Sequence, residues 1–257
     1  MTISRRLFML SAAMVPFGCG SMGYLRGTAI PAPSPLPAVR APQVGQEWSY
    51  LQRDMFNGNT LGTLIERVQS VGSQIVITRS MDTSAATSNS SSGAFGAIMK
   101  DINQLNEPIG SMANEVQGPW GTFLANPNWK TLVLFNPGVP AWPQQLNESW
   151  SKQTNTKYQV AGNAGYTFPW EEYMSASGWE TITVPAGTFT ALKFSSLVNY
   201  TSPDANKINC IWRETCWFAP QIGRWVARES SGSYMLIGVM QSPFLENEYS
   251  WQLSSWK

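Results

Sequence analysis

The stretch of sequence that decides the fold is Trp179–Glu229, which reads WETITVPAGTFTALKFSSLVNYTSPDANKINCIWRETCWFAPQIGRWVARE. From Leu192 to Tyr200, apolar or small residues occupy every second position and alternate with polar ones. Successive side chains of a strand point to opposite faces, so this alternation predicts a strand with one wet face. The VPAG sequence at Val184–Gly187 separates it from an earlier β-branched run, which predicts a hairpin turn.

Two more turns follow within the same stretch. Ser202–Asn206 is rich in turn-forming residues, and Ala219–Gly223 combines Pro220 with a glycine, which ends one strand and permits a reversal. Between these turns, five residues are expected to share one face of a strand: Ile208, Cys210, Trp212, Cys216 and Phe218. The stretch therefore predicts three or four consecutive antiparallel strands.

Two segments of this stretch carry a resemblance to a known class of protein. The VPAGTF turn at Val184–Phe189, followed by WFAPQIG at Trp217–Gly223, resembles exported bacterial β-proteins of the TapB-like family and related domain-of-unknown-function families. A weaker echo lies between Val44 and Ile77. The resemblance implies a β fold and an exported location, and it implies no catalytic residue.

The rest of the chain extends the same pattern. Asn57–Asn59 predicts one hairpin turn and Gly72-Ser73 another, so we expect the two ends of the chain to belong to one sheet. A short strand at Lys130–Phe135 is expected to end at Asn136–Pro140, and strands resume after Glu148. About twelve strands result. The predicted fold is all-β, an antiparallel meander forming a curved sheet, open barrel or half-barrel, with one inserted short helix.

The helix is expected inside an insertion that spans about residues 82–145. After a Ser/Thr-rich run, apolar residues recur at spacings of three and four up to Leu105, which predicts an amphipathic helix that packs on the sheet. Its apolar face gives four candidate ligand-binding residues: Phe95, Ile98, Met99 and Ile102.

The N-terminus resembles an export signal. Residues 1–18 hold two arginines and a short apolar run, and Ser4–Met9 is similar to the twin-arginine signature. Gly18-Cys19 resembles a lipobox, so Cys19 is the predicted lipidation site, with cleavage of an unlipidated secreted chain as the alternative. Because Gly20 replaces the aspartate of inner-membrane retention, we expect an outer-membrane lipoprotein that faces the periplasm.

A proline-rich segment separates this anchor from the domain. Ile30–Pro42 is expected to be extended polyproline II and to act as a spacer. The predicted organisation is a signal peptide at 1–18, a lipidated cysteine and stalk at 19–43, and a single β domain at 44–257.

The composition excludes several functions. The net charge of +1 among 257 residues leaves no excess of Lys and Arg for nucleic acid. The chain has no histidine, which removes Ser-His-Asp and Cys-His catalysis and the commonest ligand of several metals. Nucleotide and hydrolase motifs are absent as well, so we expect a protein that is not an enzyme and holds no cofactor and no metal.

Cys210 and Cys216 are a candidate disulfide pair in an oxidising envelope. Six residues along a strand span about 20 Å, whereas a disulfide needs Cα atoms about 4.4 to 6.8 Å apart. The disulfide would therefore require a bulge or a tight reversal between the two cysteines.

Twelve tryptophans are many for this length. Most alternate with polar residues as inward-facing side chains do, but four lie among prolines and glycines and are candidate ligand-binding residues: Trp120, Trp129, Trp142 and Trp170. The leading hypothesis is a non-enzymatic, lipid-anchored envelope protein whose sheet presents a groove for an apolar ligand or a protein partner. A glycan-binding module that uses the loop tryptophans is the alternative, and a cryptic hydrolase is the third.

Overall fold

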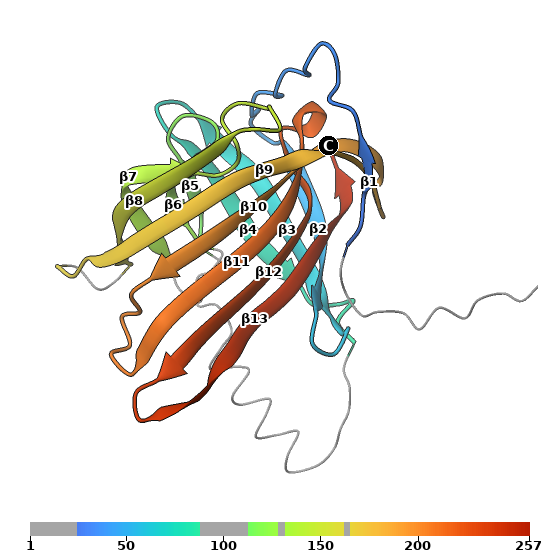
Figure 1. Ribbon diagram of the computed structural model, residues 1–257. Coiled ribbons are helices and arrows are strands. Elements are labelled where there is room, and N and C mark those ends of the chain that lie inside the picture. The colour runs from blue at the N-terminus through green and yellow to red at the C-terminus, as the bar shows by residue number, and fades with distance from the viewer. Residues whose placement is uncertain (1–24, 88–112, 128–131, 162–164) are drawn as a thin grey trace, which may run out of the picture.

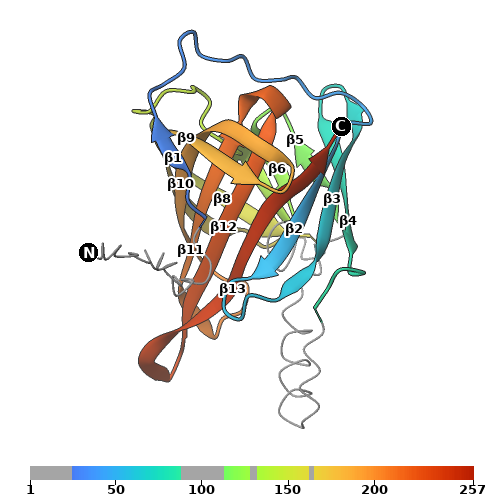
Figure 2. The ribbon, with the colours of Figure 1, turned by 90° about the vertical axis from the view of Figure 1, so that its right-hand side faces the viewer.

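A computed structural model describes residues 25–87, 113–127, 132–161 and 165–257. Within these ranges the chain forms an antiparallel barrel (Figures 1 and 2). The strands are β1 (Thr28–Ile30), β2 (Glu47–Asp54), β3 (Thr60–Val71), β4 (Ile75–Asp82), β5 (Glu115–Gln117), β6 (Thr122–Asn126), β7 (Val133–Pro140), β8 (Ser151–Val160), β9 (Phe168–Val184), β10 (Gly187–Tyr200), β11 (Lys207–Ala219), β12 (Arg224–Leu236) and β13 (Val239–Trp256), with the 3₁₀ turn η2 (Pro220–Ile222) between β11 and β12. The prediction of an all-β meander is confirmed.

The barrel closes because the first and last of its strands pair with each other. From β2 to β13 each strand pairs with the next one in sequence, and β13 then pairs with β2 from Tyr249↔Asp54 to Trp256↔Trp48. This pairing confirms the prediction that the two ends of the chain belong to one sheet. Closure pairs the outer edges of β2 and β13, which are thereby withdrawn from pairing with other chains.

Alternation of buried and exposed residues defines the inside of the barrel. In β2, Trp48, Tyr50 and Gln52 are buried and their neighbours are not. The turns at Asn57–Asn59, Gly72-Ser73, Val184–Gly187, Ser202–Asn206 and Ala219–Gly223 all lie where the sequence predicts them. We call the end that carries η2 and the C-terminus the upper end, and the end that carries the β12–β13 turn the lower end (Figure 1).

Several strands are longer than the alternation predicts. The sequence indicates separate strands at 149–154 and 157–161, but β8 is continuous from Ser151 to Val160. Likewise β9 runs without a break from Phe168 to Val184, with a register shift opposite Lys193/Phe194. In β9, the bulge reverses the alternation without ending the strand, so a pattern-based boundary appears where none exists.

The insertion expected at about residues 82–145, with one short strand at Lys130–Phe135, contains three paired strands in its described part. β5 and β6 form a hairpin across Gly118–Gly121, and β7 does not end at Asn136 but continues to Pro140. The pairing of β6 with β7 shifts register between Phe123 and Ala125 and then resumes at Val139 and Pro140. The prediction that Asn136–Pro140 ends the strand is therefore wrong, because a bulge accommodates these residues.

The proline-rich segment is extended and lies against the barrel from Leu25 onward. β1 pairs with the upper part of β9, the Arg40 amide donates to the Pro220 carbonyl at 2.9 Å, and Trp120 Nε1 donates to the Arg40 carbonyl at 3.2 Å. The segment crosses the upper end of the barrel (Figure 2). The predicted helix at 95–105, Trp129 and Cys19 lie outside the described residues.

Within the described ranges, the chain has no helix with the length and apolar character that a membrane crossing requires.

Candidate functional site

Three of the four candidate loop tryptophans are described, and they pack into the barrel. Trp142 and Trp170 are 4% and 6% exposed, and Trp120 is half-buried between Trp48 and Trp142. The Trp120 and Trp142 rings meet edge to face at 4.9 Å. A sugar-binding platform needs an exposed ring face. Trp120 and Trp142 instead pack at the upper end of the barrel, and Trp170 packs against Phe135 and Tyr158 in a separate cluster.

A glycine fixes the packing at the upper end. Gly121 has φ of +95°, and a Cβ at this position would lie 2.9 Å from the Trp142 ring. Only glycine adopts this conformation without strain and leaves room for the indole. The glycine at position 121, the last residue of the GPWG sequence, is therefore required by packing against Trp142.

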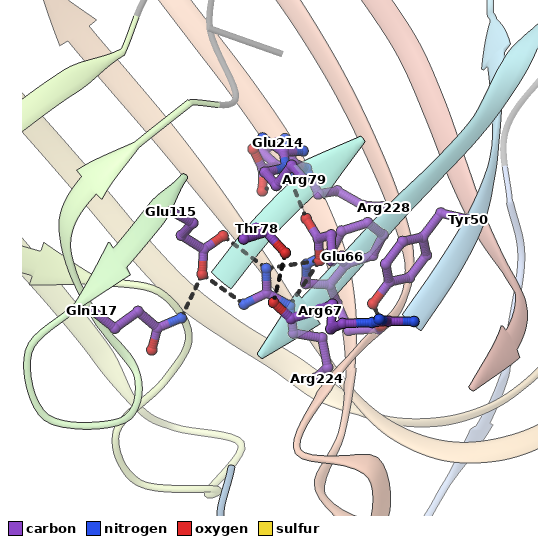
Figure 3. A network of polar contacts seen from close by, with 11 residues as sticks. Tyr50, Glu66, Arg67, Thr78, Arg79, Glu115, Gln117, Glu214, Arg224 and Arg228 are labelled. Atoms are coloured by element: carbon purple, nitrogen blue, oxygen red, sulfur yellow. Dashed lines mark hydrogen bonds and ion pairs between the residues drawn. The ribbon is translucent and has the colours of Figure 1, made fainter. Parts of the chain in front are cut away.

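The upper half of the interior holds a network of four buried charged residues: Glu66 on β3, Arg79 on β4, Glu115 on β5 and Arg224 on β12 (Figure 3). Arg224 Nη2 lies 2.8 Å from Glu66 and 2.7 Å from Glu115, and Arg79 Nε lies 3.2 Å from Glu66. Gln117 donates to Glu115 at 2.7 Å. Two carboxylates thus face two guanidinium groups, and the network joins strands that are far apart in sequence.

Burial and pairing act in opposite directions on these groups. Burial favours the neutral form of Glu115, but Arg224, Gln117 and Arg79 together outweigh it and hold the pKa of Glu115 below its ordinary value. Burial would also lower the pKa of Arg224, yet Glu115 and Glu66 raise this pKa well above the usual range. All four groups are sealed from solvent, so the network serves as a structural link and not as a substrate site.

A second cluster of polar groups lies further along the interior. Glu214 accepts from Trp212 Nε1 at 3.3 Å and from the Cys216 thiol at 3.0 Å, and Arg228 Nε lies 3.2 Å from it. Glu172 accepts from Trp170 Nε1 at 3.4 Å. Burial raises the pKa of Glu172 to about 7, with a further contribution from Glu214.

This second cluster surrounds a cavity of about 40 Å³ lined by Glu172, Glu214, Cys216 and Arg228 together with several aromatic side chains. A cavity of this size has room for a few water molecules. It is too small for an apolar ligand such as a lipid chain.

The two cysteines of β11 are both free and buried. They lie six residues apart on the inner face, and Cys216 bonds to Glu214. The candidate disulfide is therefore absent from the structure, because β11 runs on without a reversal between them. Burial raises the pKa of both thiols, so neither is a ready thiolate.

The barrel wall is interrupted beside β8. β7 pairs with β8 only from Val133↔Val160 to Phe135↔Tyr158, whereas β9 pairs with β8 from Ser151 to Tyr158. Among the described residues, no strand therefore pairs with the other edge of Ser151–Lys157. Across this gap the Thr156 hydroxyl donates to the Pro137 carbonyl at 3.4 Å.

An open hollow of about 880 Å³ lies next to this free edge. Four asparagines contribute to its lining: Asn136, Asn155, Asn199 and Asn209. All four are exposed, whereas Trp170 and Cys210, which also belong to the lining, are buried. The surface that the hollow offers to a ligand is thus rich in amides, each with donors and an acceptor. We call this hollow the amide groove.

The sequence predicts neither the charged network nor the amide groove. A signal for the network exists, because Glu66 and Arg79 stand at inward positions of their alternating strands. The groove depends on pairings among five strands, β7 to β11, which no local pattern specifies. Within the described residues, no cluster of three or more acidic, cysteine or histidine side chains has the geometry of a metal site.

Comparison with known proteins gives two structural neighbours. One is named as an exported protein with a YmcC-like fold from Bacteroides fragilis, with 16% identity and a TM-score of 0.46 over 86% of this chain and 99% of that chain. The other is named as a lipoprotein from Parabacteroides distasonis, with 12% identity and a TM-score of 0.47 over the same shares. At this level the likeness concerns the fold alone. No family model and no curated protein matches the chain.

Proposed function

We propose that the protein is a lipid-anchored, non-enzymatic component of the bacterial cell envelope that binds a protein partner at the free edge of β8. The observation that carries this proposal is the unpaired edge of Ser151–Lys157 beside the amide groove. In this reading, an extended segment of the partner adds to β8 as a further strand.

The chemistry of the edge suits an extended peptide. An unpaired strand edge presents backbone N–H and C=O groups, and an added strand satisfies them while its side chains enter neighbouring pockets. Exposed Asn155 on β8 and Asn199 on β10 offer amides that can bond to peptide groups or polar side chains. Lys152 and Lys157 on the same strand favour an acidic segment and disfavour edge-to-edge aggregation.

The other ligand classes have less support. The cavity of about 40 Å³ inside the barrel is too small for an apolar ligand, and among the described loop indoles Trp142 and Trp170 are buried and Trp120 is half-buried. For a hydrolase, the buried carboxylates Glu172 and Glu214 offer no room for a substrate between them.

The anchor is carried by Cys19, which follows the apolar run of the export signal. An acyl chain contributes about 0.8 kcal/mol per buried methylene, and stable anchoring needs more than one chain. A Cys19→Ala variant is expected to leave the membrane fraction when cells are broken and centrifuged. A variant that still sediments with outer membranes contradicts lipid anchoring.

The binding edge is tested by site-specific cross-linking in the producing bacterium. We expect a photoreactive p-benzoylphenylalanine at Asn155 to yield a discrete, higher-mass adduct with an envelope protein on illumination. The matched control places the same residue at Gln69, an exposed position of β3. Equal adducts at both positions, or none at Asn155, contradict the assignment of β8 as the binding edge.

A further inference from the structure

The lower end of the barrel carries a set of exposed apolar side chains. Phe56 in the β2–β3 turn is 78% exposed, Ile237 in the β12–β13 turn is 61% exposed, and Phe244 and Leu245 on β13 are 39% and 65% exposed. We call these four residues the apolar rim. Single exposed apolar residues are ordinary, but a set gathered at one end of a molecule marks an interaction surface.

The rim residues reach the same end of the molecule from two hairpins. The Met55 amide donates to the Glu248 carbonyl at 2.8 Å, which places the β2–β3 turn beside β13. The β12–β13 hairpin extends further down than the β2–β3 turn and ends at its own turn, which contains Ile237. In Figure 1 this hairpin is the lowest of the coloured ones. Phe244 stacks on Tyr234 at 5.5 Å, so the two strands of the hairpin are in contact near its tip.

The N-terminal part of the chain points to the same end. The Leu25 amide donates to the carboxylate of Glu229, near the middle of β12. From there β1 runs toward the upper end in both views, so the described part of the chain begins on the lower side of β1 (Figures 1 and 2).

The length of chain allows the anchor to reach the level of the apolar rim. Leu25 follows the Cys19 anchor by six positions, a distance of at most about 20 Å when fully extended. From Glu229 to Ile237, β12 and its turn span about 27 Å along the strand, or about 20 Å along the barrel axis at the usual strand tilt. Anchor and hairpin tip can therefore reach the same plane.

From these observations we propose that the apolar rim docks on the lipid surface that holds the anchor, with Ile237 and Leu245 inserted among the lipid headgroups. This inference rests on the lipid anchor of the proposed function. It places the free edge of β8 at the membrane-facing half of the barrel and leaves the upper end directed away from the bilayer.

The charged residues near the rim indicate that the rim binds lipid by inserting apolar side chains and not by attraction to anionic headgroups. Lys207 is held by Glu246 at 3.1 Å and covers the Tyr234 ring, and Asp54 and Glu248 lie beside the β2–β3 turn. Among the described residues, the rim thus has no cluster of basic side chains of the kind that binds acidic headgroups. Docking is expected to be nearly independent of salt.

The test uses a fluorescent probe that reports the depth of one residue. The full chain with Ile237→Cys is extracted from membranes, labelled with the polarity-sensitive dye NBD and reconstituted into phosphatidylcholine vesicles that contain doxyl-labelled lipid. Cys210 and Cys216 are buried, so the dye attaches to the new thiol. The matched control is Val44→Cys, at an exposed position of the upper end whose side chain is 67% exposed.

We expect the dye at residue 237 to shift to shorter wavelength and to be quenched several-fold more strongly than the dye at residue 44, equally at low and high salt. Leu245→Ser in the Ile237→Cys chain is expected to reduce this quenching while circular dichroism stays unchanged.

Three results would overturn the proposal. If the protein sediments with vesicles but the dye at 237 is quenched no more than the dye at 44, lipid anchoring is supported and docking of the apolar rim is contradicted. If the spectral shift occurs without vesicles and grows with protein concentration, the rim joins two copies of the chain. If the chain with intact Cys19 does not associate with vesicles, the anchor fails and the docking fails with it.

Discussion

Glu115 and Glu47 form a natural comparison at the scale of single residues, because each carboxylate is paired with basic side chains. Glu115 is fully buried against Arg224, whereas Glu47 meets Arg67 and Lys257 at the surface. Removal of one partner of a buried ion pair leaves an uncompensated charge and costs about 3 to 5 kcal/mol. We therefore expect Glu115→Gln to lower the free energy of unfolding by an amount in this range, as measured by urea denaturation.

Glu47→Gln is the control for this prediction. A solvent-exposed ion pair contributes about 0 to 1 kcal/mol, so its loss is expected to leave the urea midpoint nearly unchanged. Equal effects of the two substitutions would contradict the structural role assigned to the buried network.

Glu172 makes stability depend on pH. Burial raises its pKa in the folded protein from 4.5 to about 7, so between these pH values the folded state holds a proton that the unfolded state has lost. The stabilising effect of this proton is complete below pH 4.5 and is lost as pH rises through 7. We expect the free energy of unfolding to fall by about 3 kcal/mol between pH 5 and pH 8 on this account.

The measurement compares urea denaturation of the wild-type chain and of Glu172→Gln at pH 5 and pH 8. The variant cannot ionise at this position, so its stability is expected to depend less on pH. A variant with the same pH dependence as the wild type would show that another group is responsible.

The sequence predicts which side chains face the interior of the barrel, but it does not predict which partner each of them contacts. The alternation around Leu64, Glu66 and Val68 places a glutamate at an inward position, but it does not tell which cation meets it. Arg224 is 158 residues away in sequence and reaches Glu66 because the closed barrel brings their strands to a common interior. Pairing of this kind depends on the whole topology.

At the scale of elements, turns could be predicted more accurately than strand ends. Turn residues act locally, so VPAG and Asn57–Asn59 mark real reversals. Strand ends depend on the neighbouring strand: β7 continues through Asn136–Pro140 because β6 is there to pair with Val139. The free edge of β8 escapes prediction for the same reason, since it results from where β7 stops pairing.

The docking of the proline-rich segment gives a prediction at this scale. Gly223 has φ of +68°, and a Cβ there would lie 2.5 Å from the Arg40 carbonyl oxygen. Gly223→Ala is expected to displace the segment around Arg40, to destabilise the fold by about 1 to 3 kcal/mol and to open the Arg40-Ala41 bond to trypsin.

Gly187→Ala is the matched control, because Gly187 also has positive φ, +127°, but has no atom within 4 Å of the added Cβ. This variant is expected to show backbone strain without faster cleavage after Arg40. Cleavage at the same rate in both variants would contradict the close contact between Gly223 and the segment.

At the scale of the whole molecule, closure of the barrel is the feature that organises the rest. It follows from the pairing of β13 with β2 at opposite ends of the chain, and it leaves the edge of β8 at Ser151–Lys157 as an opening in the wall. A meander could be predicted from alternation and turns. Its closure could not, because sheet curvature depends on bulges whose positions are fixed by pairing.

The central claim is that this free edge of β8 binds an extended segment of a partner. It is tested most directly by hydrogen exchange with mass spectrometry, comparing the full chain in membrane vesicles isolated from the producing bacterium with the same chain purified in detergent. We predict that amides of Ser151–Lys157 exchange more slowly in the native vesicles, while those of β3 exchange equally in both. Equal exchange of Ser151–Lys157 in the two preparations would contradict the claim.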